Sequence, residues 1–169
     1  MRASSLACIA LLAAALHGQA ANDAAFSIQE QGSTAWLVKP NRQRFFSLGV
    51  CVVNQGASRQ DYNPTNPGYA AFQHYATSNL WVEVVLKRLK AWHFTTIGGW
   101  SDYAALKSQR EADVAFIPVL AVGITCGVPW FDMWDTNIIA RMHHVARDQI
   151  LPLRDDPRVL GYYSDNEIG

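Results

Sequence analysis

The sequence predicts an α/β fold, the N-terminal half of a (β/α)8 TIM barrel, with strands 1 to 4 and the intervening helices. Short apolar runs rich in β-branched residues alternate with segments of helical periodicity, in the order β-α-β-α-β-α-β. The connections are long enough for parallel pairing. A flavodoxin-like or Rossmann sheet is the alternative for this order, and it is disfavoured because no GxGxxG or P-loop run follows any strand.

Composition indicates one globular core and a neutral ligand. Half of the 169 residues are hydrophobic, and 14 basic residues balance 14 acidic ones. A chain without net charge sets up no long-range field for nucleic acid or an anionic membrane, and no Lys/Arg run is interleaved with aromatic residues. We therefore expect a neutral, polar ligand and no nucleic-acid partner.

The first twenty residues have the pattern of a cleaved signal peptide. Arg2 precedes an apolar stretch over residues 6–16, and small residues around Ala20 suit a signal peptidase. A membrane anchor, the competing interpretation, needs roughly 18 apolar residues, and this stretch is shorter. We expect a secreted or periplasmic protein that has no membrane contact after residues 1–20 are removed.

Two cysteines, Cys51 and Cys126, remain after the signal peptide. The spacing around them matches no metal-binding pattern, so we expect neither a metal nor another cofactor. Export would allow the two to form a disulfide, whereas their apolar surroundings favour buried free thiols. Both alternatives remain open at this point.

Residues 21–44 are expected to form an N-terminal arm or hairpin, because two extended pieces flank a turn at residues 32–34. The partial barrel is assigned to residues 45–169. Its first strand, residues 45–53, is almost continuously apolar, which is typical of a strand buried on both faces.

Residues 54–79 are expected to form a long loop, because two Asn-Pro pairs interrupt them. Long loops in compact domains are usually functional. Its aromatic residues either stack on sugar rings or hold the loop against its own barrel. They are Tyr62, Tyr69, Phe72, His74 and Tyr75.

The first helix follows this loop. Its apolar positions recur at helical spacing, and Ser78 or Asn79 can cap its start. The apolar positions are Trp81, Val84, Val85, Leu89 and Trp92. His93 stands where a left-handed residue normally closes a helix.

Two further strand and helix pairs complete the order. Residues 94–99 form the second strand, after which Ser101 or Asp102 caps a helix that ends near residue 111. The third strand, residues 114–122, contains Pro118 and therefore needs a bulge or a missing ladder bond. Asp135 or Thr136 caps the third helix, which ends before residue 152.

The fourth strand, residues 159–164, ends in Asp165, Asn166 and Glu167. In a barrel of this type the C-terminal ends of the strands converge on one face, where catalytic residues lie. An abrupt change from apolar to polar residues at a strand end therefore marks a candidate site. The alternative is that these are ordinary loop residues, since Asp and Asn favour turns.

Three segments resemble the N-terminal half of clan A glycoside hydrolases, above all their β-agarase-like and β-galactosidase-like branches. They are residues 44–50 (RFFSLGV), residues 89–92 (LKAW) with 96–102 (TIGGWSD), and residues 161–167 (GYYSDNE). The Asp-Asn-Glu end of the fourth strand is the most specific part, and the resemblance extends over most of the chain after the signal peptide.

The resemblance implies a retaining hydrolase of polysaccharides or oligosaccharides, which uses two carboxyl groups. Glu167 matches the acid/base, and Asn166 matches the asparagine that binds the sugar 2-hydroxyl. Trp100, Asp102 and Tyr163 are the further expected contacts with the carbohydrate. An acid that works near neutral pH needs a raised pKa, for which Trp130 and the strand-end aromatic residues can supply apolar walls.

Two departures from the family pattern affect the prediction. Clan members carry the nucleophile at the end of strand seven, so we expect this chain to be a fragment that is inactive alone. A half-barrel also leaves strand edges unpaired, which favours self-association. Gly98 and Gly99 stand where the resemblance leads us to expect a polar residue before Trp100.

Two other functions remain open. A non-catalytic carbohydrate-binding or structural half-barrel would use the aromatic loop and need no second carboxylate. An inverting hydrolase would take its base from Asp61, Asp102 or Asp132, which lie on loops predicted at the same face.

Overall fold

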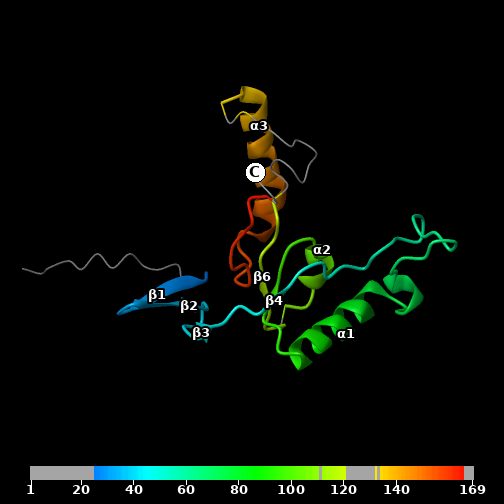
Figure 1. Cartoon of the computed structure of the whole chain (residues 1–169), viewed down its shortest axis with the longest axis horizontal. Coiled ribbons are helices and arrows are strands. Elements are labelled where there is room, and N and C mark those ends of the chain that lie inside the picture. Colours follow the sequence, from blue (N-terminus) through cyan, green and yellow to red (C-terminus); the bar gives the residue numbers. More distant parts are fainter. Residues whose placement is uncertain (1–24, 111, 121–131, 133, 166–169) are drawn as a thin grey trace, which may run out of the picture.

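The computed structural model describes residues 25–110, 112–120, 132 and 134–165. These residues form a mixed α/β molecule with two small sheets and few helices (Figure 1). The predicted signal peptide, Cys126, Trp130, Asn166 and Glu167 lie outside the described residues.

An antiparallel sheet begins the described chain. Strands β1 (Ser27–Gln31) and β2 (Thr34–Val38) form a hairpin, in which Gly32 adopts a φ of 61° that suits glycine in a tight turn. Strand β3 (Arg44–Phe45) pairs with β2, so this sheet reaches one residue beyond the predicted boundary at 44. The ion pair between Lys39 and Asp113, 2.6 Å long, ties the sheet to the rest of the molecule.

The second sheet is parallel and contains β4 (Gly49–Val50), β5 (Thr96–Ile97) and β6 (Ala115–Phe116) in sequence order. Two parallel bridges, Phe116↔Val159 and Val119↔Tyr163, align the predicted fourth strand beside β6. The four predicted strands therefore lie side by side in the expected order.

The fourth strand carries one residue more than its neighbour between these bridges. Three positions separate Phe116 from Val119, whereas four separate Val159 from Tyr163. Pro118, which has no N–H to donate, lies within this irregular stretch, and its carbonyl accepts from the Tyr163 N–H at 2.8 Å. The prediction of an irregular ladder at Pro118 is confirmed.

The prediction of a first strand buried on both faces over residues 45–53 is wrong. Phe45 belongs to the antiparallel sheet, while Phe46 is 75% exposed and Val52 is 58% exposed. Among the described residues β4 pairs with β5 alone, so its other edge has no strand against it. Val52 has a left-handed φ of 62°, which ends the extended run.

Helix α1 (Ser78–Ala91) follows a largely irregular loop that contains one short turn, η1 (Ala71–Gln73). Its cap is Thr77 and not the predicted Ser78 or Asn79, because the Thr77 hydroxyl accepts from the Leu80 N–H at 3.1 Å. Trp92, predicted on the buried side, is 62% exposed. His93 closes the helix with a φ of 61°, as predicted.

Helix α2 (Tyr103–Leu106) is capped by Asp102 and ends before the predicted residue 111. The Arg158 guanidinium takes the carbonyls of Lys107 and Gln109 at 3.0 and 2.8 Å, and these oxygens would otherwise serve a longer helix.

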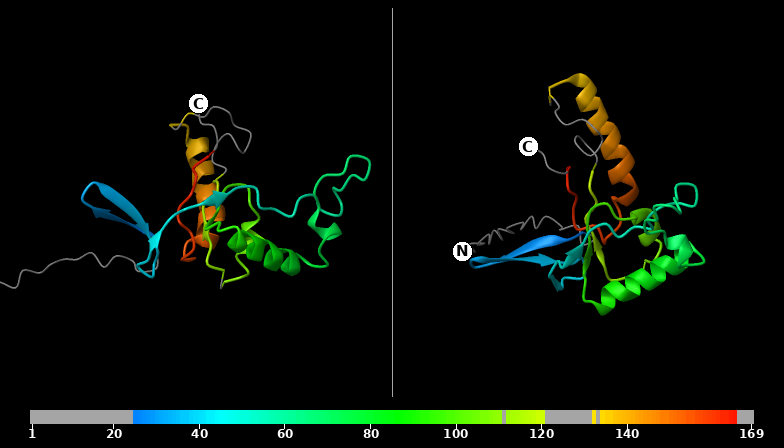
Figure 2. Two further views of the ribbon diagram at one scale, coloured as in Figure 1. Left: turned by 60° about the horizontal axis from the view of Figure 1, so that its bottom comes forward. Right: turned by 45° about the vertical axis from the view of Figure 1, so that its right-hand side comes forward.

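Helix α3 (Thr136–Val145) is capped by Asp135, as the sequence allowed, with the Asn137 N–H donating at 2.7 Å. It continues through a wider turn, η3 (Ala146–Ile150), and a tighter one, η4 (Leu151–Leu153). Figure 2 shows α3 extending away from the parallel strands.

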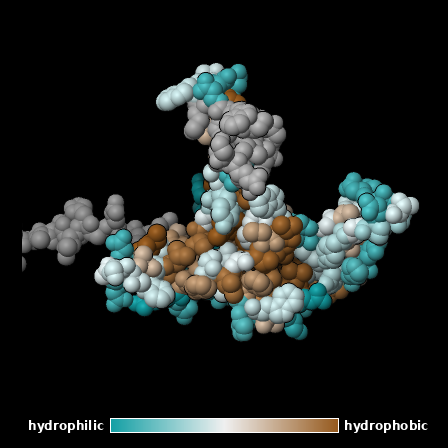
Figure 3. Space-filling model, viewed as in Figure 1, coloured by the Kyte–Doolittle hydropathy of each residue, from teal (hydrophilic) through white to brown (hydrophobic). Residues whose placement is uncertain are grey.

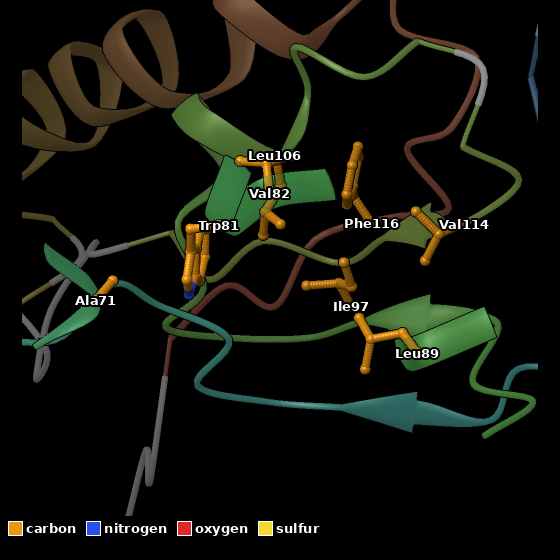
Figure 4. Close-up of a cluster of buried hydrophobic side chains, with 8 residues drawn as sticks. All are labelled: Ala71, Trp81, Val82, Leu89, Ile97, Leu106, Val114 and Phe116. Carbon is orange, nitrogen blue, oxygen red and sulfur yellow. The ribbon is translucent and has the colours of Figure 1, made fainter. Parts of the chain in front are cut away.

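The core lies on the side of the parallel strands that α1 and α2 cover. Trp81, Val82 and Leu89 of α1 pack with Ile97 of β5 and Phe116 of β6 (Figure 4). Figure 3 shows apolar surface gathered over the middle of the molecule, between the β1–β2 hairpin and the loop before η1.

Candidate functional site

The segments that follow β4 and β5 are hydrogen-bonded to each other at the carboxyl ends of the strands. We call residues 52–55 together with residues 98–102 the strand-end bracket. The Val52 N–H donates to the Gly99 carbonyl at 2.9 Å, and the Asp102 N–H donates to the Val53 carbonyl at 2.9 Å. These bonds hold two loops in one place on the face where parallel α/β folds bind ligands.

Two residues of the strand-end bracket have left-handed backbones that are unusual for their side chains. Val52 has a φ of 62°, and Trp100 has a φ of 56°. Such a conformation costs roughly 1–2 kcal/mol for a residue other than glycine. Residues of this kind concentrate at binding and catalytic sites, where the surrounding structure holds them.

Gly98 and Gly99 allow the strands to approach closely. A Cβ atom on Gly98 would lie 2.8 Å from the Cys51 sulfur, and one on Gly99 would lie 2.6 Å from a methyl group of Val119. The close approach explains why glycine occupies the position where the resemblance led us to expect a polar residue. Cys51 is exposed and carries a free thiol.

Trp100 lies at the end of β5, in the middle of the strand-end bracket. Its side chain is 49% exposed, and its carbonyl accepts from the Asn54 side-chain amide at 3.4 Å. An indole that is half exposed beside a strand end can present a face to a sugar ring. Its predicted contact with carbohydrate stays a prediction.

Tyr163 occupies the matching place on the fourth strand, and its side chain is also 49% exposed. Its backbone is fixed on both sides, because its N–H donates to Pro118 and its carbonyl accepts from Leu120, each at 2.8 Å. Asn166 and Glu167 follow it within four residues and lie outside the described residues. Two accessible aromatic side chains therefore stand at the ends of two parallel strands.

Asp102 has a structural role in the described residues. One carboxylate oxygen accepts from the Ala105 N–H at 3.3 Å and caps α2, and the other accepts from the Gln55 amide at 2.5 Å. Each carboxylate oxygen can accept a second hydrogen bond, so these two contacts do not exclude a sugar hydroxyl. The predicted substrate contact of Asp102 remains untested.

The two other aspartates proposed as bases for an inverting hydrolase form local turns. The Asp61 carboxylate accepts from the Ser58 hydroxyl at 2.5 Å, and the Asp132 carboxylate accepts from the Trp134 N–H at 2.8 Å. These bonds stabilise the loops in which the two residues lie.

Tyr103 supports the strand-end bracket from beneath. Its hydroxyl contacts the carbonyl oxygen of Gly98 and that of Ile117, the latter at 3.0 Å, and thus links the ends of β5 and β6. Burial raises the pKa of this phenol well above its ordinary value, so the group stays protonated and donates. Its ring packs edge-on against Phe116.

Tyr162 lies beside the exposed Tyr163 on the fourth strand. Its hydroxyl oxygen is buried without a hydrogen-bond partner among the described atoms. Burial and, to a lesser extent, the negative charge of Asp156 raise its pKa.

The aromatic residues of the long loop mainly hold that loop in place. The Tyr69 hydroxyl accepts from the Trp81 indole at 3.0 Å, and the Tyr75 hydroxyl accepts from Arg88 at 3.1 Å. Phe72 packs against Tyr62, with ring centroids 5.5 Å apart. Of the two interpretations of this loop, these contacts favour the one in which the rings pin it to the protein.

The same loop is closed at its neck. Gly56 and Ala70 form an antiparallel bridge, so residues 57–69 make an excursion whose two ends meet. Gly56 has a φ of 70°, and a Cβ atom there would lie 2.0 Å from the Tyr69 carbonyl oxygen. Only glycine fits this position.

A cleft of about 550 Å³ lies elsewhere, between the region around α2 and residues 151–158. Its charged lining includes Lys107, Arg110, Asp155 and Arg158. Residue 158 comes directly before the fourth strand, so the cleft opens near the amino end of that strand. It does not belong to the strand-end bracket.

The described part of the chain shows neither a metal-binding cluster nor a membrane-spanning helix. There, no group of three or more His, Cys, Asp or Glu side chains is arranged to hold a metal ion. Within the same residues, no helix has the length and apolar character needed to cross a membrane.

The chain is similar to a curated protein in sequence and to a solved structure in fold, while no protein-family model matches it. The sequence is similar to Beta-agarase A of Vibrio sp. (strain JT0107), 26% identical over 148 residues that cover 75% of this chain and 15% of the agarase. The structure is similar to the crystal structure of BpGH50, with a TM-score of 0.54 and 17% identity over 86% of this chain and 34% of that one.

These comparisons show that the chain shares the fold of part of BpGH50. It spans about a third of the length of BpGH50 and a smaller share of the agarase.

The sequence pattern places Trp100, Ser101 and Asp102 at the end of the second strand, but it assigns Ser101 no role beyond a possible helix cap and assigns none to Asn54 or Tyr103. The bonds of Asn54 and Ser101 cross 46 and 48 positions of the chain, a range that no local pattern reports.

Proposed function

We propose that this chain is part of a glycoside hydrolase that cleaves an agar-type polysaccharide or its oligosaccharides. The observation that carries the proposal is the similarity to a β-agarase over 75% of the chain, which the fold similarity to BpGH50 supports. Parallel strands with exposed aromatic residues at their carboxyl ends suit such a substrate, because aromatic faces stack on sugar rings.

The proposed mechanism is retaining and uses two carboxyl groups. Glu167 protonates the glycosidic oxygen of the leaving sugar while a second carboxylate attacks the anomeric carbon. Glu167 then removes a proton from the water that releases the product. We assign the second carboxylate to a part of the barrel that these 169 residues do not include, because the relatives are several times longer.

Asn166 is proposed to bind the sugar 2-hydroxyl, and Trp100 and Tyr163 are proposed to stack on neighbouring sugar rings. The support is their position, since both aromatic side chains are half exposed at strand ends. The export that we propose from the pattern of residues 1–20 is consistent with a polysaccharide substrate, which is too large to enter a cell.

The test is Glu167→Gln in the active protein that contains this segment. Turnover of agar oligosaccharides should fall by about 10²–10⁴-fold, because the amide cannot donate the proton that the leaving sugar needs. Aryl glycosides with good leaving groups should lose less in the first step. Glu30→Gln, a change of the same kind on exposed strand β1, is the control and should keep wild-type rates. Unchanged turnover in Glu167→Gln would refute the assignment.

A second candidate is a carbohydrate-binding module without catalysis, which the accessible Trp100 and Tyr163 favour. Titration calorimetry with an agar oligosaccharide separates the two functions. Binding that depends on Trp100, in a protein that does not hydrolyse the oligosaccharide, would support the binding module. For an active protein, the anomeric configuration of the first product, measured by NMR, separates retention from inversion.

A further inference from the structure

We propose that Ser101 is a positioning residue, which fixes the backbone of Trp100 so that the indole keeps one orientation at the strand end. The inference rests on the proposed function, in which Trp100 stacks on a sugar. It assigns to Ser101 a role in substrate binding that requires no contact between Ser101 and the substrate.

The Ser101 hydroxyl makes two complementary bonds. It donates to the Gly98 carbonyl at 2.7 Å and accepts from the Val53 N–H at 3.1 Å. A hydroxyl has one proton to donate, and this proton is used on the segment before Trp100. The oxygen holds the neighbouring loop, so a single side chain ties the two halves of the strand-end bracket together.

Trp100 needs this support because its backbone is strained. At a φ of 56° a tryptophan lies outside its preferred regions, and the strain persists only where other interactions maintain it. The carbonyls before and after the Trp100 Cα are fixed as well. The Gly99 carbonyl accepts from the Val52 N–H, and the Trp100 carbonyl accepts from the Asn54 side-chain amide. Without the Ser101 bonds, the backbone can relax to a negative φ, which turns the Cα–Cβ bond and moves the ring.

Among the residues that the structure describes, the Trp100 indole takes part in no aromatic or cation–π pair, unlike the rings of Tyr69 and Phe72 in the long loop. The backbone at residue 100 therefore sets the direction in which this side chain leaves the strand end. A ring that is presented in one orientation loses less conformational entropy when a ligand binds.

The experiment compares Ser101→Ala with Ser101→Thr, which restores the hydroxyl. Trp100→Phe identifies the Trp100 indole signal in the ¹H–¹⁵N spectrum. We expect Ser101→Ala to shift or broaden that signal, and Ser101→Thr to keep it near its wild-type position. Ser47→Ala is the matched control, because it removes a hydroxyl bond 2.8 Å long to Thr96 elsewhere in the same sheet, and it should leave the Trp100 signal in place.

Affinity for an agar hexasaccharide is the second measurement. Ser101→Ala should weaken binding about three- to tenfold, which corresponds to the worth of one aromatic contact, and Ser101→Thr should restore it. If Ser101→Ala does not fold, Asn54→Ala takes its place and should shift the same indole signal.

The outcomes separate this inference from the proposed function. An unchanged Trp100 signal in Ser101→Ala, or in Asn54→Ala where that replaces it, would overturn the inference. So would a shift of equal size in Ser47→Ala. If the signal responds as expected but Trp100→Ala has no effect on hexasaccharide affinity, positioning stands and the proposed function of Trp100 fails.

Discussion

Arg158 shows how one side chain can hold several segments together. Its guanidinium binds the Asp156 carboxylate through two bonds of 2.9 and 2.7 Å and lies 4.8 Å from the centre of the Phe116 ring. It also takes the two carbonyls that follow α2. One side chain therefore neutralises the Asp156 carboxylate, packs on the Phe116 ring and satisfies the carbonyls at the end of α2.

The Arg158–Asp156 pair should make stability depend on pH. The bond to Arg158 lowers the pKa of Asp156 below its ordinary value, so the folded state favours the ionised carboxylate. This contribution is fully present above the unfolded pKa of about 4, and it is lost as pH falls through the lower folded pKa. In Asp156→Asn, the melting temperature should be lower near neutral pH and should fall less on acidification than in the wild type.

Asp155→Asn is the control for this prediction. The pKa of Asp155 is also lowered, by Arg154, but both side chains are exposed and their pair is screened by solvent. Its melting profile between neutral pH and about pH 3 should follow the wild type. A profile of Asp156→Asn that also follows the wild type would contradict the prediction.

At the scale of single residues, the sequence predicted that Trp100 and Tyr163 stand at strand ends but did not indicate what holds them. Trp100 was identified because it follows an apolar strand directly. The bond that fixes its neighbour Ser101 comes from Val53, 48 positions away, and no local pattern reports a contact of that range. The strain at Val52 was not predictable either, because valine favours extended backbone.

At the scale of elements, alternating apolar and helical segments were sufficient to predict the order and the parallel pairing of the strands. The ends of the elements were less predictable. Helix α2 ends early because Arg158, 52 positions beyond Leu106, takes the next carbonyls. Helix α1 begins one residue before the expected position, since Thr, Ser and Asn at adjacent positions are all good caps.

The cap of α1 gives a direct test of this difference. Thr77→Ala should reduce the free energy of unfolding by about 1 kcal/mol, because the Leu80 N–H loses its acceptor. Ser78→Ala, one position further, should change it by less than about 0.5 kcal/mol. Urea denaturation of both variants is the measurement, and the reverse order of the two losses would favour the cap expected from the sequence.

The neck of the long loop gives a second test at this scale. Gly56→Ala should cost at least about 2 kcal/mol, because a left-handed φ is combined with a clash against the backbone of Tyr69. Gly68→Ala, in the same loop with open space around it, should leave stability unchanged or raise it by less than about 1 kcal/mol. Equal effects of the two variants in thermal denaturation would argue against the closed neck.

At the scale of the molecule, the apolar side chains around β4 are the main departure from expectation. The nearly continuous apolar run over residues 45–53 predicted a buried strand, yet Phe46, Leu48 and Val52 are 75%, 43% and 58% exposed. An apolar run predicts that both faces of a strand are buried, but it does not indicate which segments pack against them.

This exposed face should cause self-association, as the sequence predicted for an open strand edge. We expect the sedimentation coefficient of the 169-residue chain to rise with concentration over the micromolar range. The double change Phe46→Ser with Leu48→Ser should reduce this rise. Ile28→Ser removes a side chain that is 69% exposed on the β1–β2 hairpin and should leave the rise unchanged. A chain that stays monomeric at all concentrations would contradict the prediction.

The meeting ends of the 57–69 excursion have a consequence for diversification. Since Gly56 and Ala70 are already paired, the tip of the excursion, residues 63–68, can change in length or composition without altering the path of β4 and η1. Tyr62 and Tyr69 on either side of the tip keep the ring and hydroxyl contacts that hold the loop. Grafting a foreign peptide between Tyr62 and Tyr69 would use the protein as a display scaffold.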